Sequence, residues 1–305
     1  MPLDPGLETM LTQLAQMGGP TTREVGPVQA RELYQGMALL NGDLVDVERI
    51  DDVTVASRPA RVYAATTGAG PLPIIVWYHG GGWTIGDLDT AERTCRRLAA
   101  GTGALVVSID YRLGPEDPYP AAADDCFAAL QWLVDHGSTL GGDPSRIAIG
   151  GDSAGGNLSA VVALHARDAG IPLRLQLLVY PVTDCTMSSA SYDANGEGYL
   201  LTRDTMEWFI ENYIGHGDAK DPRVSPLFAE RVAGAAPALV FTAEFDPLRD
   251  EGEAYAARLR DEGVDVEVRR FDGQTHSFFE LTTITPTAAS EAMGLAVERL
   301  RAALA

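Results

Sequence analysis

Short apolar runs recur along the chain and predict the strands of one sheet. Several of these runs are continuously apolar instead of alternating, which is typical of strands covered on both faces. The predicted strands comprise residues 45–54, 61–65, 72–78, 104–109, 147–150, 173–180, 238–243 and 264–271.

Helical periodicity occupies the segments between these runs. The predicted helices comprise residues 89–100, 121–136, 155–169, 251–262 and 288–304. Regular alternation of strands and helices predicts a mostly parallel sheet with right-handed crossovers.

Two segments depart from this alternation. In the first 40 residues, apolar positions at helical spacing run from Leu7 to Met17 and end at Gly18-Gly19-Pro20, and a second helix is expected over 28–40. Residues 182–226 contain no clear strand but several aromatic residues. A connection this long between core strands predicts a lid or an insertion.

The clearest chemical motif is Gly151-Asp152-Ser153-Ala154-Gly155, which lies directly between a predicted strand and a predicted helix. This is the required context of a G-x-S-x-G nucleophile elbow, although the bare motif also occurs in plain glycine-rich turns. The following helix N-terminus offers free N–H groups and the positive end of a dipole. Asp152 is expected to be a carboxylate of the helix terminus and to take no part in proton transfer.

A second motif, His79-Gly80-Gly81-Gly82-Trp83, follows the apolar strand that ends at residue 78. An HGGG run of this kind supplies oxyanion-hole donors in lipases and esterases. Three glycines allow backbone N–H groups to point inward without a Cβ in the way. We interpret His79 as an organiser of this loop and not as a catalytic base.

A serine nucleophile needs a histidine base, and in proteins with this kind of nucleophile elbow the histidine follows the serine in the chain. His165 lies too far along the helix that leaves the elbow, and His216 is expected in a solvent-exposed turn of the 182–226 segment. His276 follows the last predicted strand, at the carboxyl edge where parallel sheets place their active sites. His276 is therefore the predicted base.

The acid that orients the base is expected at the end of the preceding strand. Asp246 stands directly before Pro247, which breaks the strand and disfavours helix at Asp246. Glu244 is the nearest rival, and Asp250 is expected to cap the next helix. Asp246 is the predicted acid.

Composition and charge exclude other classes of protein. The 305 residues carry 43 carboxylates against 23 bases, a net charge of −20, which argues against binding to nucleic acid or anionic lipid. The 3 cysteines form no disulfide framework or CxxC pair and suit a reducing compartment. No cationic leader and no apolar run of membrane length is visible, so a cytoplasmic protein without membrane association is expected.

These motifs, together with residues 110–116 (DYRLGPE) and 246–252 (DPLRDEG), make the chain resemble the hormone-sensitive lipase family of α/β-hydrolases, in its bacterial esterase branch. The resemblance implies one α/β-hydrolase domain over 1–305, with an eight-stranded, mostly parallel sheet whose second strand is antiparallel. It implies a helical cap formed by about 1–42 and 183–225. By position, the oxyanion donors would be the amides of Gly81, Gly82 and Ala154.

The resemblance also sets the expected activity, a serine carboxylesterase acting on short- to medium-chain acyl esters of small molecules. It implies neither cofactor nor metal, and a homodimer is possible. Two departures from the family pattern, Gly114 and Asp117, put only local loop packing in doubt. The rival functions are an amidase or deacetylase using the same site, and a ligand-binding relative that has lost catalysis.

Aromatic residues are the candidates for substrate contact, and they are Trp83, Tyr199, Trp208, Phe209 and Tyr213. Phe209 and Tyr213 are four residues apart and can share one face of a helix, with Trp208 toward its flank. That face either roofs the acyl pocket or packs the insertion onto the sheet, and the sequence leaves both possibilities open.

Overall fold

An eight-stranded sheet forms the centre of the computed structural model, which describes residues 1–66, 68 and 70–305. The strand order is β1-β2-β4-β3-β5-β6-β7-β8. Strand β2 is antiparallel to β1 and β4, and every other neighbouring pair is parallel. The strands are β1 Arg49–Val55, β2 Arg58–Ala64, β3 Leu72–Tyr78, β4 Leu105–Ile109, β5 Gly142–Asp152, β6 Gln176–Val179, β7 Ala238–Phe245 and β8 Val266–Thr275. The predicted fold class is confirmed.

The strand bounds differ most from prediction in β5. This strand begins at Gly142, five residues before the predicted start, because Leu72 and Pro73 at the start of β3 pair with Gly142 and Asp143. The register then shifts between Pro73 and Ile74. The segment from Gly142 to Arg146 has no apolar pattern of its own, so only pairing with β3 makes it a strand.

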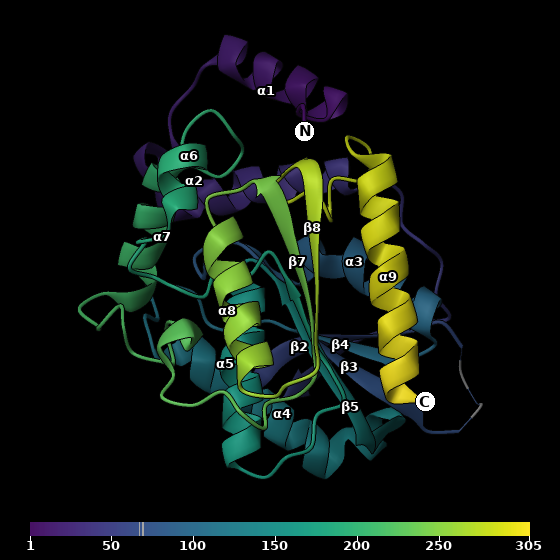
Figure 1. Cartoon of the computed structure of the whole chain (residues 1–305). Coiled ribbons are helices and arrows are strands. Elements are labelled where there is room, and N and C mark those ends of the chain that lie inside the picture. Colours follow the sequence, from purple (N-terminus) through teal and green to yellow (C-terminus); the bar gives the residue numbers. More distant parts are fainter. Residues whose placement is uncertain (67, 69) are drawn as a thin grey trace.

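Helices cover both faces of the sheet (Figure 1). Buried side chains of α3 and α9 pack with Trp77 and Phe241 in one apolar cluster. Those of α4 and α5 pack with Val76 and Ile149 in a second cluster, and α8 packs with α5 in a third. The helices are α3 Leu88–Thr102, α4 Ala121–His136, α5 Ala154–Asp168, α8 Arg249–Asp261 and α9 Pro286–Leu304.

The two segments outside the alternating pattern are helical. The N-terminal segment forms α1 Pro5–Met17 and α2 Thr22–Met37, followed by the short 3₁₀ helix η1 Ala38–Asn41. Helix α2 begins earlier than predicted. It is interrupted at Gly26, the residue before Pro27, where the φ of 77° is not helical. The later segment forms α6 Ala190–Asn195 and α7 Arg203–Ile214, which lie near α2 at one end of the sheet (Figure 1).

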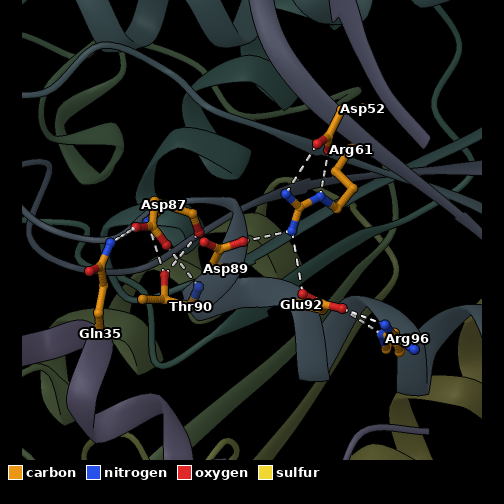
Figure 2. A network of polar contacts seen from close by, with 8 residues as sticks. All are labelled: Gln35, Asp52, Arg61, Asp87, Asp89, Thr90, Glu92 and Arg96. Atoms are coloured by element: carbon orange, nitrogen blue, oxygen red, sulfur yellow. Dashed lines mark hydrogen bonds and ion pairs between the residues drawn. The ribbon is translucent and has the colours of Figure 1, made fainter. Parts of the chain in front are cut away.

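Polar contacts attach α2 to the core at the start of α3. Figure 2 shows the Gln35 amide donating to Asp87, whose other carboxylate oxygen accepts from the Thr90 N–H in the first turn of α3. A second set of contacts begins at Asp89, also in the first turn of α3, which accepts from Arg61 of β2. Its remaining members are Asp52, Glu92 and Arg96. Because Asp87 follows the HGGGW loop closely, these contacts join α2, the loop and the sheet edge.

Candidate active site

Ser153 occupies a strained turn between β5 and α5. Its φ of 55° and ψ of −117° place a non-glycine residue in a sparsely populated conformation, as a nucleophile elbow requires. A Cβ added to Gly155 would lie 1.8 Å from the Tyr78 carbonyl oxygen, and one added to Gly151 would lie 2.4 Å from that same oxygen. The two glycines therefore let α5 begin directly against the end of β3.

Three side chains from three different strand ends form one hydrogen-bonded chain. His276 Nε2 lies 3.0 Å from Ser153 Oγ, and His276 Nδ1 lies 2.7 Å from Asp246 Oδ2. In the neutral tautomer protonated on Nδ1, the ring donates to Asp246 and accepts from the Ser153 hydroxyl. Asp246 is fully buried, and its other oxygen accepts from the Leu248 N–H at 2.9 Å. The carboxylate is thus held on both oxygens.

The rival acids take other partners. The Glu244 carboxylate accepts from the Gly273 N–H of β8 and from the N-terminal ammonium group of Met1, each at 2.7 Å. Asp250 lies in the first turn of α8 and pairs with Arg249. Neither carboxylate is hydrogen-bonded to His276, so the geometry favours Asp246.

The two other histidines that follow Ser153 also lie outside this hydrogen-bonded chain. His165 packs its ring edge-on against Phe127, 5.3 Å between centroids, on α5. His216 is exposed in the turn after α7.

Two glycines of the HGGGW loop, Gly81 and Gly82, line the same cavity as Ser153. Gly81 and Gly82 have φ values of 109° and 56°, and within the described part of the chain neither N–H has a backbone acceptor in the loop. The Gly81 carbonyl accepts from the amides of Thr84 and Ile85, which closes the turn. The Ala154 amide, at the start of α5, is the third expected donor.

Asp152 lies directly before Ser153, the N-cap residue of α5, so it is near the helix terminus as expected. It is the last residue of β5, and its carboxylate accepts from the Gly80 N–H at 3.0 Å. A Cβ on Gly80 would lie 2.0 Å from this carboxylate, so the close approach requires glycine. Burial raises the pKa of Asp152 to about 7, and the nearby His276 opposes this rise. Asp152 therefore fixes the HGGGW loop to the elbow.

His79 is the first residue of the HGGGW loop and takes no part in the hydrogen bonds that join Ser153, His276 and Asp246. Its Nδ1 contacts the Gly80 carbonyl at 2.7 Å, and its ring stacks on Tyr111 with 4.3 Å between centroids. The Tyr111 hydroxyl donates to the His79 carbonyl at 2.7 Å. Burial lowers the pKa of His79, which favours the neutral ring. These contacts agree with the interpretation of His79 as a loop organiser.

A cavity of about 150 Å³ opens onto Ser153 and His276. Its remaining walls come from the HGGGW loop, from α2, from residues 200–209 and from the loop after His276. The lining includes Gly81, Gly82, Ile85, Thr22, Tyr34, Met37, Leu200, Leu201, Thr205, Phe209, Ser277 and Leu281. Of the five aromatic candidates for substrate contact, only Phe209 is on this wall.

The other four aromatic candidates pack elsewhere. Trp83 is fully buried and stacks on Tyr213 of α7 at 4.2 Å between centroids. Tyr199 stacks on Phe245 at 5.1 Å, and Trp208 tilts against Phe209. We therefore assign these four rings to packing instead of substrate contact.

Gly114, one of the two departures from the family pattern, has a steric explanation in its contact with α7. Gly114 donates its N–H to the Trp83 carbonyl at 2.8 Å, and a Cβ added to it would lie 2.3 Å from the Asn212 carbonyl oxygen of α7. A side chain at this position would push α7 away from the loop.

The remaining candidate features of the described residues are metal ligands, thiols and membrane spans. No group of three or more histidine, cysteine or acidic side chains is placed to hold a metal ion there. Cys95, Cys126 and Cys185 are buried free thiols. None of the helices in that part of the chain is both long enough and apolar enough to cross a membrane.

Comparisons with known proteins agree on one family. A family model described as an alpha/beta hydrolase fold matches residues 75–280. The chain is 49% identical over 231 residues to the carboxylic ester hydrolase LipN of Mycobacterium tuberculosis, covering 73% of this chain and 61% of that protein. It is 36% identical over 323 residues to the ethyl acetate hydrolase of Pseudomonas putida, covering 99% of each. The structure of a hyperthermophilic esterase from the archaeon Pyrobaculum calidifontis is 39% identical and matches 100% of both chains with a TM-score of 0.94.

Proposed function

Since the chain belongs to the hormone-sensitive lipase family of α/β-hydrolases and is a carboxylic ester hydrolase, we propose that Ser153 is its nucleophile, His276 its general base and Asp246 the acid that orients the base. The observation that carries this proposal is the hydrogen-bonded chain from Asp246 through His276 to Ser153. Geometry of this kind defines a Ser-His-Asp triad irrespective of sequence position.

In the acylation half-reaction, Ser153 Oγ attacks the ester carbonyl carbon while His276 Nε2 takes the hydroxyl proton. The carbonyl π electrons move onto oxygen, and the amides of Gly81, Gly82 and Ala154 stabilise the resulting oxyanion. Collapse of the tetrahedral intermediate breaks the bond to the alcohol oxygen, which receives the proton from His276. The alcohol leaves, and an ester between the acyl group and Ser153 remains.

Deacylation follows the same course with water as the nucleophile. The water oxygen attacks the acyl carbon while His276 accepts a proton from the water. When the bond to Ser153 Oγ breaks, His276 returns that proton to Oγ and the carboxylic acid is released. Asp246 holds Nδ1–H throughout, so the ring keeps the tautomer that leaves Nε2 free to accept a proton. Its negative charge also stabilises the imidazolium that forms in both half-reactions.

The substrates we propose are short- to medium-chain acyl esters of small molecules. The cavity of about 150 Å³ supports this class because its far wall consists largely of apolar side chains such as Met37, Leu201 and Phe209. The name of the Pseudomonas putida relative, an ethyl acetate hydrolase, also supports a small ester. We further propose that residues 1–42 and 183–225 act as a cap, since Tyr34 and Phe209 from these segments wall the cavity.

The proposal is tested by turnover of p-nitrophenyl esters from acetate to decanoate. The wild-type enzyme is expected to hydrolyse the shorter esters, and Ser153→Ala is expected to lose this activity while Ser290→Ala, a change at an exposed serine of α9, keeps it. The matching p-nitroanilides separate an esterase from an amidase. Retained ester turnover in Ser153→Ala, or faster cleavage of the anilides than of the esters, would contradict the proposal.

A further inference from the structure

A small chamber adjoins the active-site cavity on the side of α2. Its volume is about 30 Å³, and Tyr34, Met37, Ser277 and Leu281 line both spaces. The chamber alone is lined by Ala38, Asn41, Thr90 and Glu280. A space of this size accommodates one water-sized group and no more. Any group bound there would stay close to a substrate in the main cavity.

Glu280 gives the chamber a buried carboxyl group without a hydrogen-bond partner. The residue is only 7% exposed, lies four positions after His276, and its carboxyl makes no hydrogen bond within the described part of the chain. Burial raises the pKa of Glu280 well above its usual range, the nearby Asp152 raises it further, and Arg97 opposes the rise. The Glu280 oxygens are not among the fully buried side-chain atoms that lack a partner in the described residues, so they reach accessible space, where a bound group can pair with them.

Ser277 adds a second polar group at an energetic cost. Its φ of 70° lies in the left-handed region, which glycine adopts without strain and which disfavours other residues. The side chain lines both the chamber and the main cavity. Tyr34 likewise faces both spaces, and no hydrogen bond contributes to the raised pKa of its hydroxyl, which is caused mainly by burial.

We propose that this chamber is a subsite for a hydroxyl group of the ester substrate, with Glu280 as its hydrogen-bonding partner and Ser277 beside it. The inference rests on the proposed ester hydrolase function and narrows its substrate class to hydroxylated esters. A hydroxyl fits because it is water-sized and both donates and accepts, as a protonated carboxyl group does. The raised pKa of Glu280 favours this neutral pairing over capture of an ammonium group, which would need an ionised carboxylate.

Matched ester pairs test the subsite. On the acyl side, p-nitrophenyl 3-hydroxybutyrate is compared with the 3-methylbutyrate ester, and the 6-hydroxyhexanoate with the heptanoate. On the alcohol side, 2-hydroxyethyl acetate is compared with propyl acetate by acid release. In at least one pair, the wild-type kcat/KM is expected to favour the hydroxylated ester by about tenfold, the contribution of one well-placed hydrogen bond. Glu280→Leu is expected to remove this preference, and Glu280→Gln to keep part of it.

The readout is a ratio of two esters for each variant, so a general loss of activity cancels. Ser277→Gly provides a second variant that is expected to fold at least as stably as the wild type, because glycine relieves the strained φ, and to weaken the preference. No preference in the wild type, or a preference that Glu280→Leu leaves unchanged, would overturn the subsite. Hydrolysis of the unsubstituted esters in the same assays tests the proposed function separately, because only its failure would affect both members of every pair.

Discussion

Asp246 differs clearly from the two neighbouring acids in its hydrogen-bond partner. It contacts His276 at 2.7 Å, whereas Glu244 and Asp250 are tied to Gly273 and Arg249. Asp246→Asn is expected to lower kcat by about 10⁴-fold, the scale seen when a triad loses its acid, because an amide favours the wrong histidine tautomer.

Glu244→Gln and Asp250→Asn are the matched controls for this change, since each also replaces a carboxylate by an amide near the end of β7. Both are expected to retain most of the wild-type kcat. Steady-state kinetics on one ester suffices, and a larger loss from Glu244→Gln than from Asp246→Asn would show that the acid has been misassigned.

At this scale the sequence predicts the nucleophile, the base and the acid because each lies where a strand ends, and strand ends are visible in the apolar pattern. The contact of Asp152 with the Gly80 amide could not be predicted, because the two residues are 72 positions apart and no local pattern shows that pairing. No local pattern in the sequence points to Glu280 either. Its significance comes from burial beside α2, which depends on how distant segments pack.

Helix α7 lines the cavity with Thr205 and with the Phe209 ring. A Cβ on Gly82 would lie 2.1 Å from the Phe209 ring, so this ring sits directly over the HGGGW loop as well as on the cavity wall. Phe209→Ala is therefore expected to shift the preferred p-nitrophenyl ester toward longer acyl chains. It is also expected to destabilise the fold by up to about 3–5 kcal/mol, the usual loss for a buried phenylalanine.

Trp208→Ala is the control, because Trp208 is equally buried on α7 but does not line the cavity. It is expected to lower the melting temperature without altering chain-length preference. If a folded Phe209→Ala enzyme keeps the wild-type chain-length profile, the ring serves only to pack α7 and the roof interpretation is wrong.

Helix α2 supports the HGGGW loop through Arg31, which contacts the residues that follow this loop. The guanidinium donates to the Thr84 carbonyl at 2.8 Å and to the Gly114 carbonyl at 3.1 Å, and it pairs with Glu116. The Thr84 amide in turn donates to Gly81. Arg31→Gln is expected to lower kcat between about tenfold and about a hundredfold, since displaced oxyanion donors weaken transition-state binding more than substrate binding.

The comparison variant is Arg23→Gln in the same helix, which breaks an ion pair with Glu211 of α7 and has no contact with the loop. It is expected to leave kcat close to the wild-type value. A rise in KM with unchanged kcat in Arg31→Gln would mean that α2 shapes the pocket and does not position the amides.

At the scale of elements, the strands and the covering helices could be predicted because their periodicity is local. The positions of α2 and α7 over the site could not, since they depend on contacts such as that between Arg23 and Glu211, residues 188 positions apart. For the same reason the sequence could not distinguish Phe209, which lines the cavity, from Tyr213, which stacks on Trp83.

The whole molecule carries a net charge of −20, so its excess carboxylates repel one another in the folded state. Salt screens this repulsion, so the melting temperature is expected to rise between about 0.05 M and about 1 M sodium chloride. The exposed ion pairs lose some strength in the same range, but each contributes little.

Thermal scans at neutral pH check this expectation, and scans near the isoelectric point of about 4.5 are the control, because the net charge and its response to salt both vanish there. A melting temperature at neutral pH that is flat or falls with salt would contradict it. The possible homodimer stays a prediction at this scale.

Covalent labelling by an organophosphonate ester tests the central claim, that Ser153 is the nucleophile activated by His276, most directly. Such reagents react with a serine that is both nucleophilic and adjacent to oxyanion donors. Intact mass measurement is expected to show one adduct on the wild-type chain, peptide mapping to locate it on Ser153, and Ser153→Ala to remain unlabelled. An adduct on another serine, or labelling of Ser153→Ala at the wild-type rate, would contradict the account.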